Sequence, residues 1–92
     1  LWELVDGMKK ITAPALVITG DEDDPCLEPA LLMKRNIPTA ALVVLPRAGH
    51  TINIEEPDAF NRALFEFTSA VEMGRWTSRD PRAVVGGILG LK

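Results

Sequence analysis

The sequence predicts an α/β fold with two parallel strands and flanking helices. Two continuous apolar runs, 15–19 and 41–45, have the composition of parallel strands that are covered on both faces. Helical patterns lie before, between and after these runs, and this order favours crossover connections within one sheet. Because loops at the carboxyl ends of such strands commonly carry function, the residues after each run are the first candidates for a site.

The composition is that of one small globular domain. The chain has 92 residues, 47% hydrophobic and 25% charged, which predicts a thin core. Its net charge of -3, without a basic block, argues against a nucleic-acid partner, and no apolar run is long enough to cross a membrane. The single cysteine, Cys26, fits a reducing compartment, and no targeting segment is recognisable, so we expect a cytoplasmic protein.

The first helix and the first strand follow one another closely. Residues 1–10 have apolar side chains at helical spacing and two lysines at the end, which predicts a short amphipathic helix. This pattern starts at once at Leu1, without an initiator methionine, so we expect a piece of a longer protein. The strand 15–19 follows Pro14 and is stopped by Gly20.

An acidic segment separates the first strand from the next helix. Residues 21–24 are four consecutive acids, and two prolines follow, so we predict a loop over 20–29. Pro29 suits the first turn of a helix, and the pattern after it predicts a short helix over 28–36.

The second strand leads to the only histidine of the chain. Residues 41–45 are followed by a Pro-Arg-Ala-Gly turn and then by His50. From Pro57 the apolar residues fall on one helical stripe, which ends before Gly74. The stripe consists of Phe60, Ala63, Leu64, Phe67 and Val71. We interpret residues 75–92, with their proline and three glycines, as a C-terminal tail with one weak helical turn at most.

Three motifs resemble the last third of the α/β-hydrolase family. Residues 13–24 (APALVITGDEDD) are similar to its strand, glycine and acid loop, and residues 47–50 (RAGH) are similar to the loop of its catalytic histidine. Residues 55–67 are similar to its final helix, at matching spacing from the histidine. The motifs occur in the family's order, so the resemblance identifies 1–92 as a C-terminal fragment of an α/β-hydrolase domain, with 75–92 as its tail.

The resemblance implies a catalytic triad in the chain order nucleophile, acid, histidine. His50 matches the histidine, which takes the proton of the nucleophile. Asp23, three residues after Gly20, matches the acid that orients the imidazole. Asp24 stays an alternative, because the prolines after the acids do not stand where the family has its proline.

Other residues of the acidic segment have simpler interpretations. Asp21 and Glu22 are taken as solvated loop charges. No metal site is predicted, because Pro25 stands where a calcium loop would need its third ligand. Cys26 lies outside any nucleophile elbow and is interpreted as inert. The two tryptophans and the phenylalanines are assigned to the core or to docking surfaces.

The sequence lacks the family's nucleophile. Its two serines, Ser69 and Ser78, lie in the last predicted helix and in the tail, and no G-x-S-x-G elbow is present. We therefore expect a part of a cofactor-independent hydrolase that acts on an ester, lactone, amide or carbon–carbon bond of a small molecule, inactive by itself. The alternative is a truncated or degenerate hydrolase fold that acts in binding or structure. Either form would self-associate or pair with the missing N-terminal part, because its strands need neighbours.

Overall fold

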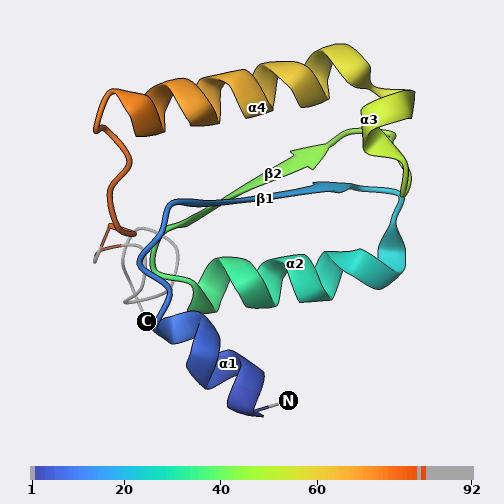
Figure 1. Ribbon diagram of the computed structural model, residues 1–92. Helices are drawn as coiled ribbons and strands as arrows, with labels where there is room; N and C mark the ends of the chain where they lie inside the picture. The colour runs from blue at the N-terminus through green and yellow to red at the C-terminus, as the bar shows by residue number, and fades with distance from the viewer. Residues whose placement is uncertain (1, 81, 83–92) are drawn as a thin grey trace.

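The computed structural model describes residues 2–80 and residue 82 and has three layers (Figure 1). The elements are, in chain order, α1 (Trp2–Lys9), β1 (Ala15–Gly20), α2 (Asp24–Asn36), β2 (Ala40–Leu45), α3 (Ile52–Glu55) and α4 (Pro57–Glu72). The helix α4 covers one face of the sheet, and α2 covers the other. The predicted order of helices and strands is confirmed.

The two strands pair in parallel, as expected for a strand, helix, strand unit. Within the described part of the chain the sheet has the order β1-β2, and its register runs from Ala15 opposite Ala40 to Gly20 opposite Leu45. Because the strands run in the same direction and in register, their carboxyl ends meet at one edge of the sheet. The acidic segment and the histidine loop leave from that edge.

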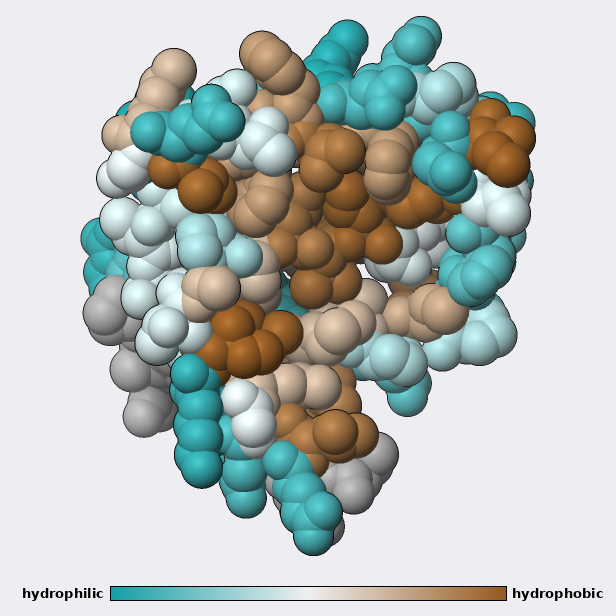
Figure 2. All heavy atoms as spheres, viewed as in Figure 1, coloured by the Kyte–Doolittle hydropathy of each residue, from teal (hydrophilic) through white to brown (hydrophobic). Residues whose placement is uncertain are grey.

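The core is as thin as the chain length predicts. The buried apolar residues among those described are Val5, Ala30, Ile37, Ala40, Leu45 and Ala48. The strands are less buried than their apolar runs led us to expect, because residues 15–18 are only partly covered and Val44 is 43% exposed. Helices cover both faces of the sheet, but the outer edges of β1 and β2 have no neighbouring strand among the described residues. Apolar side chains gather between α4 and α2 over this sheet (Figure 2).

The prediction of a loop over 20–29 and a helix over 28–36 was wrong at its boundary. The helix α2 begins at Asp24, so the loop between β1 and α2 consists of three residues, 21–23. An acid followed by a proline suits the first turn of a helix, where no intrahelical N–H bond is lost and the helix dipole favours negative charge. Pro29 lies inside α2 and removes one backbone hydrogen bond, while the adjacent Ala30 is buried against the sheet.

The predicted helix after Pro57 is confirmed, together with its glycine stop. Gly74 has φ +68° and lies just after the end of α4. Its N–H donates to the carbonyl of Val71, and the N–H of Arg75 donates to that of Ala70, which is the Schellman arrangement. The short helix α3 was not predicted, because four residues are too few to show a helical period.

Residues 75–80 pack back onto the domain. The indole N–H of Trp76 donates to the carbonyl of Thr39 at 2.7 Å, and its ring lies edge-on to Phe67 with centroids 4.7 Å apart. The backbone N–H of Arg79 donates to Pro38 at 2.8 Å. The tail predicted over 75–92 lies, for residues 81 and 83–92, outside the described residues. None of the helices described here is both long enough and apolar enough to span a bilayer.

Candidate active site

A glycine brings the two loops at the sheet edge into contact. Gly20, the last residue of β1, lies so close to the backbone of Ala48 and Gly49 that a side-chain carbon at this position would collide with their carbonyl oxygens. Ala48 itself is fully buried. The sequence showed Gly20 only as the end of a strand, whereas its main role is this close approach.

Backbone hydrogen bonds fix the acidic turn to the histidine loop. The N–H of Asp21 donates to the carbonyl of Leu45 at 3.0 Å, and the N–H of Glu22 donates to that of Ala48 at 2.9 Å. The N–H of Ala48 donates in turn to the carboxylate of Asp21 at 3.3 Å. Asp21 is exposed, as expected of a solvated charge, but it also accepts this bond. The two loops are therefore held in one relative position.

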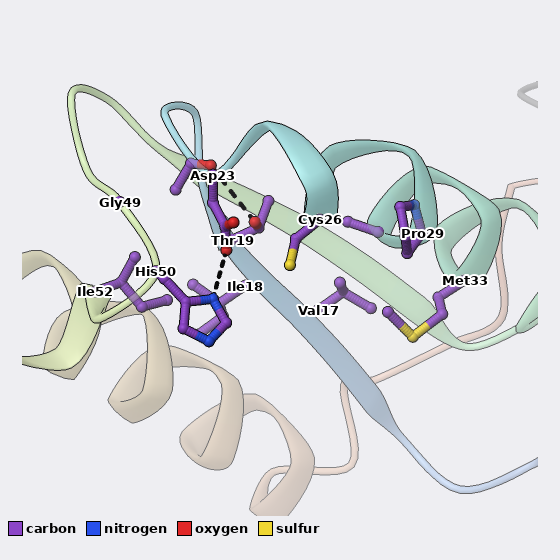
Figure 3. A pocket seen from close by; sticks show the side chains of 12 residues that line it. Val17, Ile18, Thr19, Asp23, Cys26, Pro29, Met33, Gly49, His50 and Ile52 are labelled. Carbon is purple, nitrogen blue, oxygen red and sulfur yellow. Dashed lines mark hydrogen bonds and ion pairs between the residues drawn. The ribbon is translucent and has the colours of Figure 1, made fainter.

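Across this junction the structure brings His50 and Asp23 together. Their atoms Nδ1 and Oδ2 lie 2.8 Å apart, and the close-up shows the ring turned toward the carboxylate (Figure 3). The Asp23 side chain is only 12% exposed, whereas that of His50 is 80% exposed. With a proton on Nδ1 the ring donates to the carboxylate, which leaves Nε2 free to exchange a proton.

Each partner of this pair changes the proton affinity of the other. The hydrogen bond with His50 holds the pKa of Asp23 below its ordinary value, and a hydrogen bond with the Cys26 thiol acts in the same direction. The hydrogen bond to Asp23 raises the pKa of His50. The arrangement therefore favours an ionised carboxylate next to an imidazole that readily accepts a proton.

Asp24, the alternative acid, occupies a different environment. It is exposed in the first turn of α2, where its negative charge interacts favourably with the positive end of the helix dipole. Its side chain makes no hydrogen bond among those described. Asp23 is the N-cap residue of α2, yet its carboxylate makes no capping bond to the helix. An N-cap aspartate commonly stabilises a helix by about 1 kcal/mol through a hydrogen bond to a backbone N–H of the first turn. The Asp23 carboxylate forgoes this bond and contacts His50 instead.

Glu55, which served in the sequence only as part of a motif, holds the histidine loop from its other side. Its Oε2 atom accepts hydrogen bonds from the N–H of Gly49 at 3.1 Å and from the hydroxyl of Thr51 at 3.2 Å. These two residues flank His50. Glu55 lies in α3, which was not predicted, and this explains why its role was missed.

A hollow of about 240 Å³ lies beside the pair. Its wall includes Val17 and Ile18 of β1, Met33 of α2 and the thiol-bearing Cys26 (Figure 3). Ligand atoms of Asp23, Cys26 and His50 all lie within 4.8 Å of one another, so these three residues are the described ones that could hold a metal ion.

Neither serine of the chain lies at this hollow. Ser69 is in α4, and Ser78 is in the segment after it; neither is among the residues that line the space beside His50. In the described part of the chain the site thus contains an imidazole and a carboxylate but no serine.

Known proteins share this stretch of sequence. No family model matches the chain. The 2-hydroxy-6-oxononadienedioate/2-hydroxy-6-oxononatrienedioate hydrolase of Comamonas testosteroni is 39% identical over 67 residues, which are 72% of this chain and 23% of that protein. The proline iminopeptidase of Saccharolobus solfataricus is 30% identical over 70 residues, which are 76% of this chain and 23% of that protein.

The fold has a close counterpart among solved structures. MenH from S. aureus superimposes with a TM-score of 0.69 at 29% identity, over 72% of this chain and 25% of MenH. The chain thus spans about a quarter of the length of the relatives that it matches. Sequence motifs, parallel strands and relatives agree, and the chain belongs to the α/β-hydrolase family, with the C-terminal part of that family's parallel sheet.

Proposed function

We propose that this chain supplies the base and the orienting acid of a cofactor-independent α/β-hydrolase. The observation that carries the proposal is the 2.8 Å contact between Nδ1 of His50 and Oδ2 of Asp23. Asp23 holds the ring in the tautomer with its proton on Nδ1, so Nε2 takes the proton of the nucleophile. The imidazolium that forms is stabilised by the same carboxylate and then gives its proton to the leaving group.

The nucleophile in this proposal comes from outside the 92 residues. A serine in a G-x-S-x-G elbow, together with backbone donors for the oxyanion, completes the site in a longer hydrolase that contains this chain. The chain alone offers only weak general-base assistance to water. We therefore propose that it has no hydrolase activity by itself.

The names of the relatives support cleavage next to a carbonyl group of a small molecule. Besides the Comamonas testosteroni hydrolase and the proline iminopeptidase, a 2-hydroxy-6-oxo-6-phenylhexa-2,4-dienoate hydrolase of Burkholderia cepacia is 37% identical over 67 residues. We propose the shared chemistry, attack on a carbonyl carbon of an ester, lactone, amide or activated carbon–carbon bond. The single free thiol supports a cytoplasmic location.

The test is His50→Ala in a longer hydrolase that contains this chain and a nucleophile elbow. Turnover is measured with a p-nitrophenyl ester and with 2-hydroxy-6-oxo-6-phenylhexa-2,4-dienoate. We expect a loss of about three orders of magnitude or more, while circular dichroism shows an unchanged fold because the ring is exposed. Turnover near that of the wild type would contradict the assignment. The isolated chain serves as the inactive reference.

A second candidate function is a non-catalytic binding or structural module. It is the alternative because no G-x-S-x-G elbow lies within the 92 residues. The longer gene separates the two functions, since a G-x-S-x-G after a predicted strand supports the enzyme and its absence supports the module. In both cases we propose that the outer edges of β1 and β2, which have no neighbouring strand among the described residues, pair with a second copy or with the N-terminal part of the domain.

A further inference from the structure

Three different metal-ligating side chains meet at the candidate site, which is more than proton transfer requires. Ligand atoms of Asp23, Cys26 and His50 lie within 4.8 Å of one another. Figure 3 shows the sulfur of Cys26 and the ring of His50 on the same hollow. The thiol hydrogen-bonds the Asp23 carboxylate but exchanges no proton in the proposed hydrolysis, so its sulfur is available as a third donor beside the oxygen and the nitrogen.

The backbone holds these donors before any ligand arrives. Asp23 is the N-cap residue of α2 and Cys26 lies in the first turn of that helix, where the N–H of Cys26 donates to the carbonyl of Asp23 at 2.9 Å. His50 comes from the loop after β2, which the close approach of Gly20 and the bond from Glu22 to Ala48 hold against that turn. Only side-chain rotations are needed to change the distances between the three donors.

The distances suit a tetrahedral ion of the size of Zn²⁺. Bonds of about 2.0–2.3 Å to nitrogen, oxygen and sulfur place neighbouring ligand atoms about 3.3–3.6 Å apart. The 2.8 Å pair of His50 and Asp23 has to open by about half an ångström, and the sulfur, within 4.8 Å of the other two donors, has to approach by about 1.5 Å at most. Both changes are small, and the ring of His50, which is exposed, can make most of the movement.

The donor set selects the metal. Thiolate and imidazole prefer Zn²⁺ to the oxygen-seeking Mg²⁺ and Ca²⁺. We propose that Asp23, Cys26 and His50 form a three-ligand site for Zn²⁺, with its fourth position open to water. As the sulfur–zinc bond forms, the thiol releases its proton to solvent. An imidazole that binds the ion can no longer accept a proton from the nucleophile, so Zn²⁺ would inhibit hydrolysis. This inhibitory role rests on the proposed function.

Binding is measured on the 92-residue chain with Co²⁺ as the spectroscopic probe and Zn²⁺ as the competitor. The chain has one cysteine and one histidine, so thiolate-to-cobalt absorption reports Cys26 and the imidazole NMR signals report His50. We expect one ion per chain, displaced by Zn²⁺. Cys26→Ser should remove the thiolate absorption and weaken binding by at least about tenfold, because a direct ligand is lost. Asp24→Asn, which changes a carboxylate outside the cluster, should bind like the wild type.

Circular dichroism establishes that the variants keep their fold. Absence of Co²⁺ and Zn²⁺ binding, or equal affinity in Cys26→Ser, would overturn the site. The inhibitory role is tested in the longer hydrolase by the ratio of turnover with and without Zn²⁺. In the wild type, turnover with Zn²⁺ divided by turnover without it should fall below one and return to one when EDTA is added. In Cys26→Ser this ratio should lie closer to one. Zinc binding without inhibition would overturn the inhibitory role alone, while the His50→Ala result judges the proposed function separately.

Discussion

At the scale of single residues, the pair His50 and Asp23 combines an exposed ring with a largely covered carboxylate. The ring is 80% exposed and the carboxylate 12%, so solvent screens the pair and its contribution to stability is small. The covered carboxylate nevertheless fixes the orientation of the ring. The value of this contact lies in the position and proton affinity of His50 rather than in the stability of the fold.

The pH range of this contribution follows from the two pKa shifts. The pKa of His50 is raised by Asp23. The contribution of His50 to the free energy of unfolding is therefore complete below its pKa in the unfolded chain, about 6.5, and is lost as the pH rises through the raised pKa of the folded chain. The pKa of Asp23 is lowered by His50. The contribution of Asp23 to the free energy of unfolding is therefore present above its pKa in the unfolded chain, about 3.9, and is lost as the pH falls through the lowered pKa of the folded chain. The pair therefore stabilises the chain mainly at mildly acid pH.

We predict that Asp23→Asn lowers the pKa of His50 toward its ordinary value, whereas Asp24→Asn leaves it raised. The amide cannot stabilise the imidazolium, and Asp24 has no described contact with the ring. An NMR titration of the only histidine measures this directly. In the longer hydrolase the first variant should also lose about two to four orders of magnitude in turnover. The opposite ranking would show that the acid is Asp24.

At the scale of elements, the sequence predicted those helices and strands that show a long, regular pattern of apolar residues. The strands and α4 were found because continuous apolar runs and a helical stripe extend over five residues or more. The start of α2 was misplaced, because acids and prolines suit a loop and a first helical turn equally well. The short α3 shows no period. The contacts of Glu55 depend on α3 and could not be predicted without it.

The approach of the two loops gives a prediction of its own. Gly20→Ala should destabilise the chain by about 1–3 kcal/mol, because the new methyl group collides with the backbone of Ala48 and forces it to move. The displaced loop should also carry His50 away from Asp23 and lower the pKa of the ring. Urea denaturation and the NMR titration measure the two effects.

Gly7 provides the matched control for this substitution. It lies within α1, and a side-chain carbon there meets no atom within 4 Å. Gly7→Ala should therefore stabilise the chain by up to about 1 kcal/mol, through the helix propensity of alanine. Equal effects of the two substitutions would show that Gly20 is not needed for close packing.

At the scale of the whole molecule, the described residues form part of a sheet. Both strands of the β1-β2 pair have one unpaired edge in this part of the chain, and the relatives are about four times as long as the matched segment. The sequence already indicated that neighbouring strands are lacking, since its apolar runs are typical of strands with neighbours on both sides. Half-buried strand residues and the apolar surface in Figure 2 agree with that expectation.

We predict that the isolated chain self-associates through these edges. Unpaired N–H and C=O groups next to apolar side chains gain hydrogen bonds and burial when a second copy adds a strand. Size-exclusion chromatography with light scattering should show a mass that rises with concentration. Amide hydrogens of β1 that point away from β2 should exchange more slowly in the associated form.

A variant on α4 separates edge pairing from simple apolar contact. Phe65 is 70% exposed on this helix and lies outside the sheet. If strand pairing drives association, Phe65→Ser leaves the concentration dependence of the mass unchanged, because the edges of β1 and β2 stay intact. If Phe65→Ser yields a monomer, the contact runs through the helix face instead. A wild-type monomer at all concentrations, with rapid exchange along the outer edge of β1, would contradict association altogether and would show that the two-stranded sheet is stable by itself.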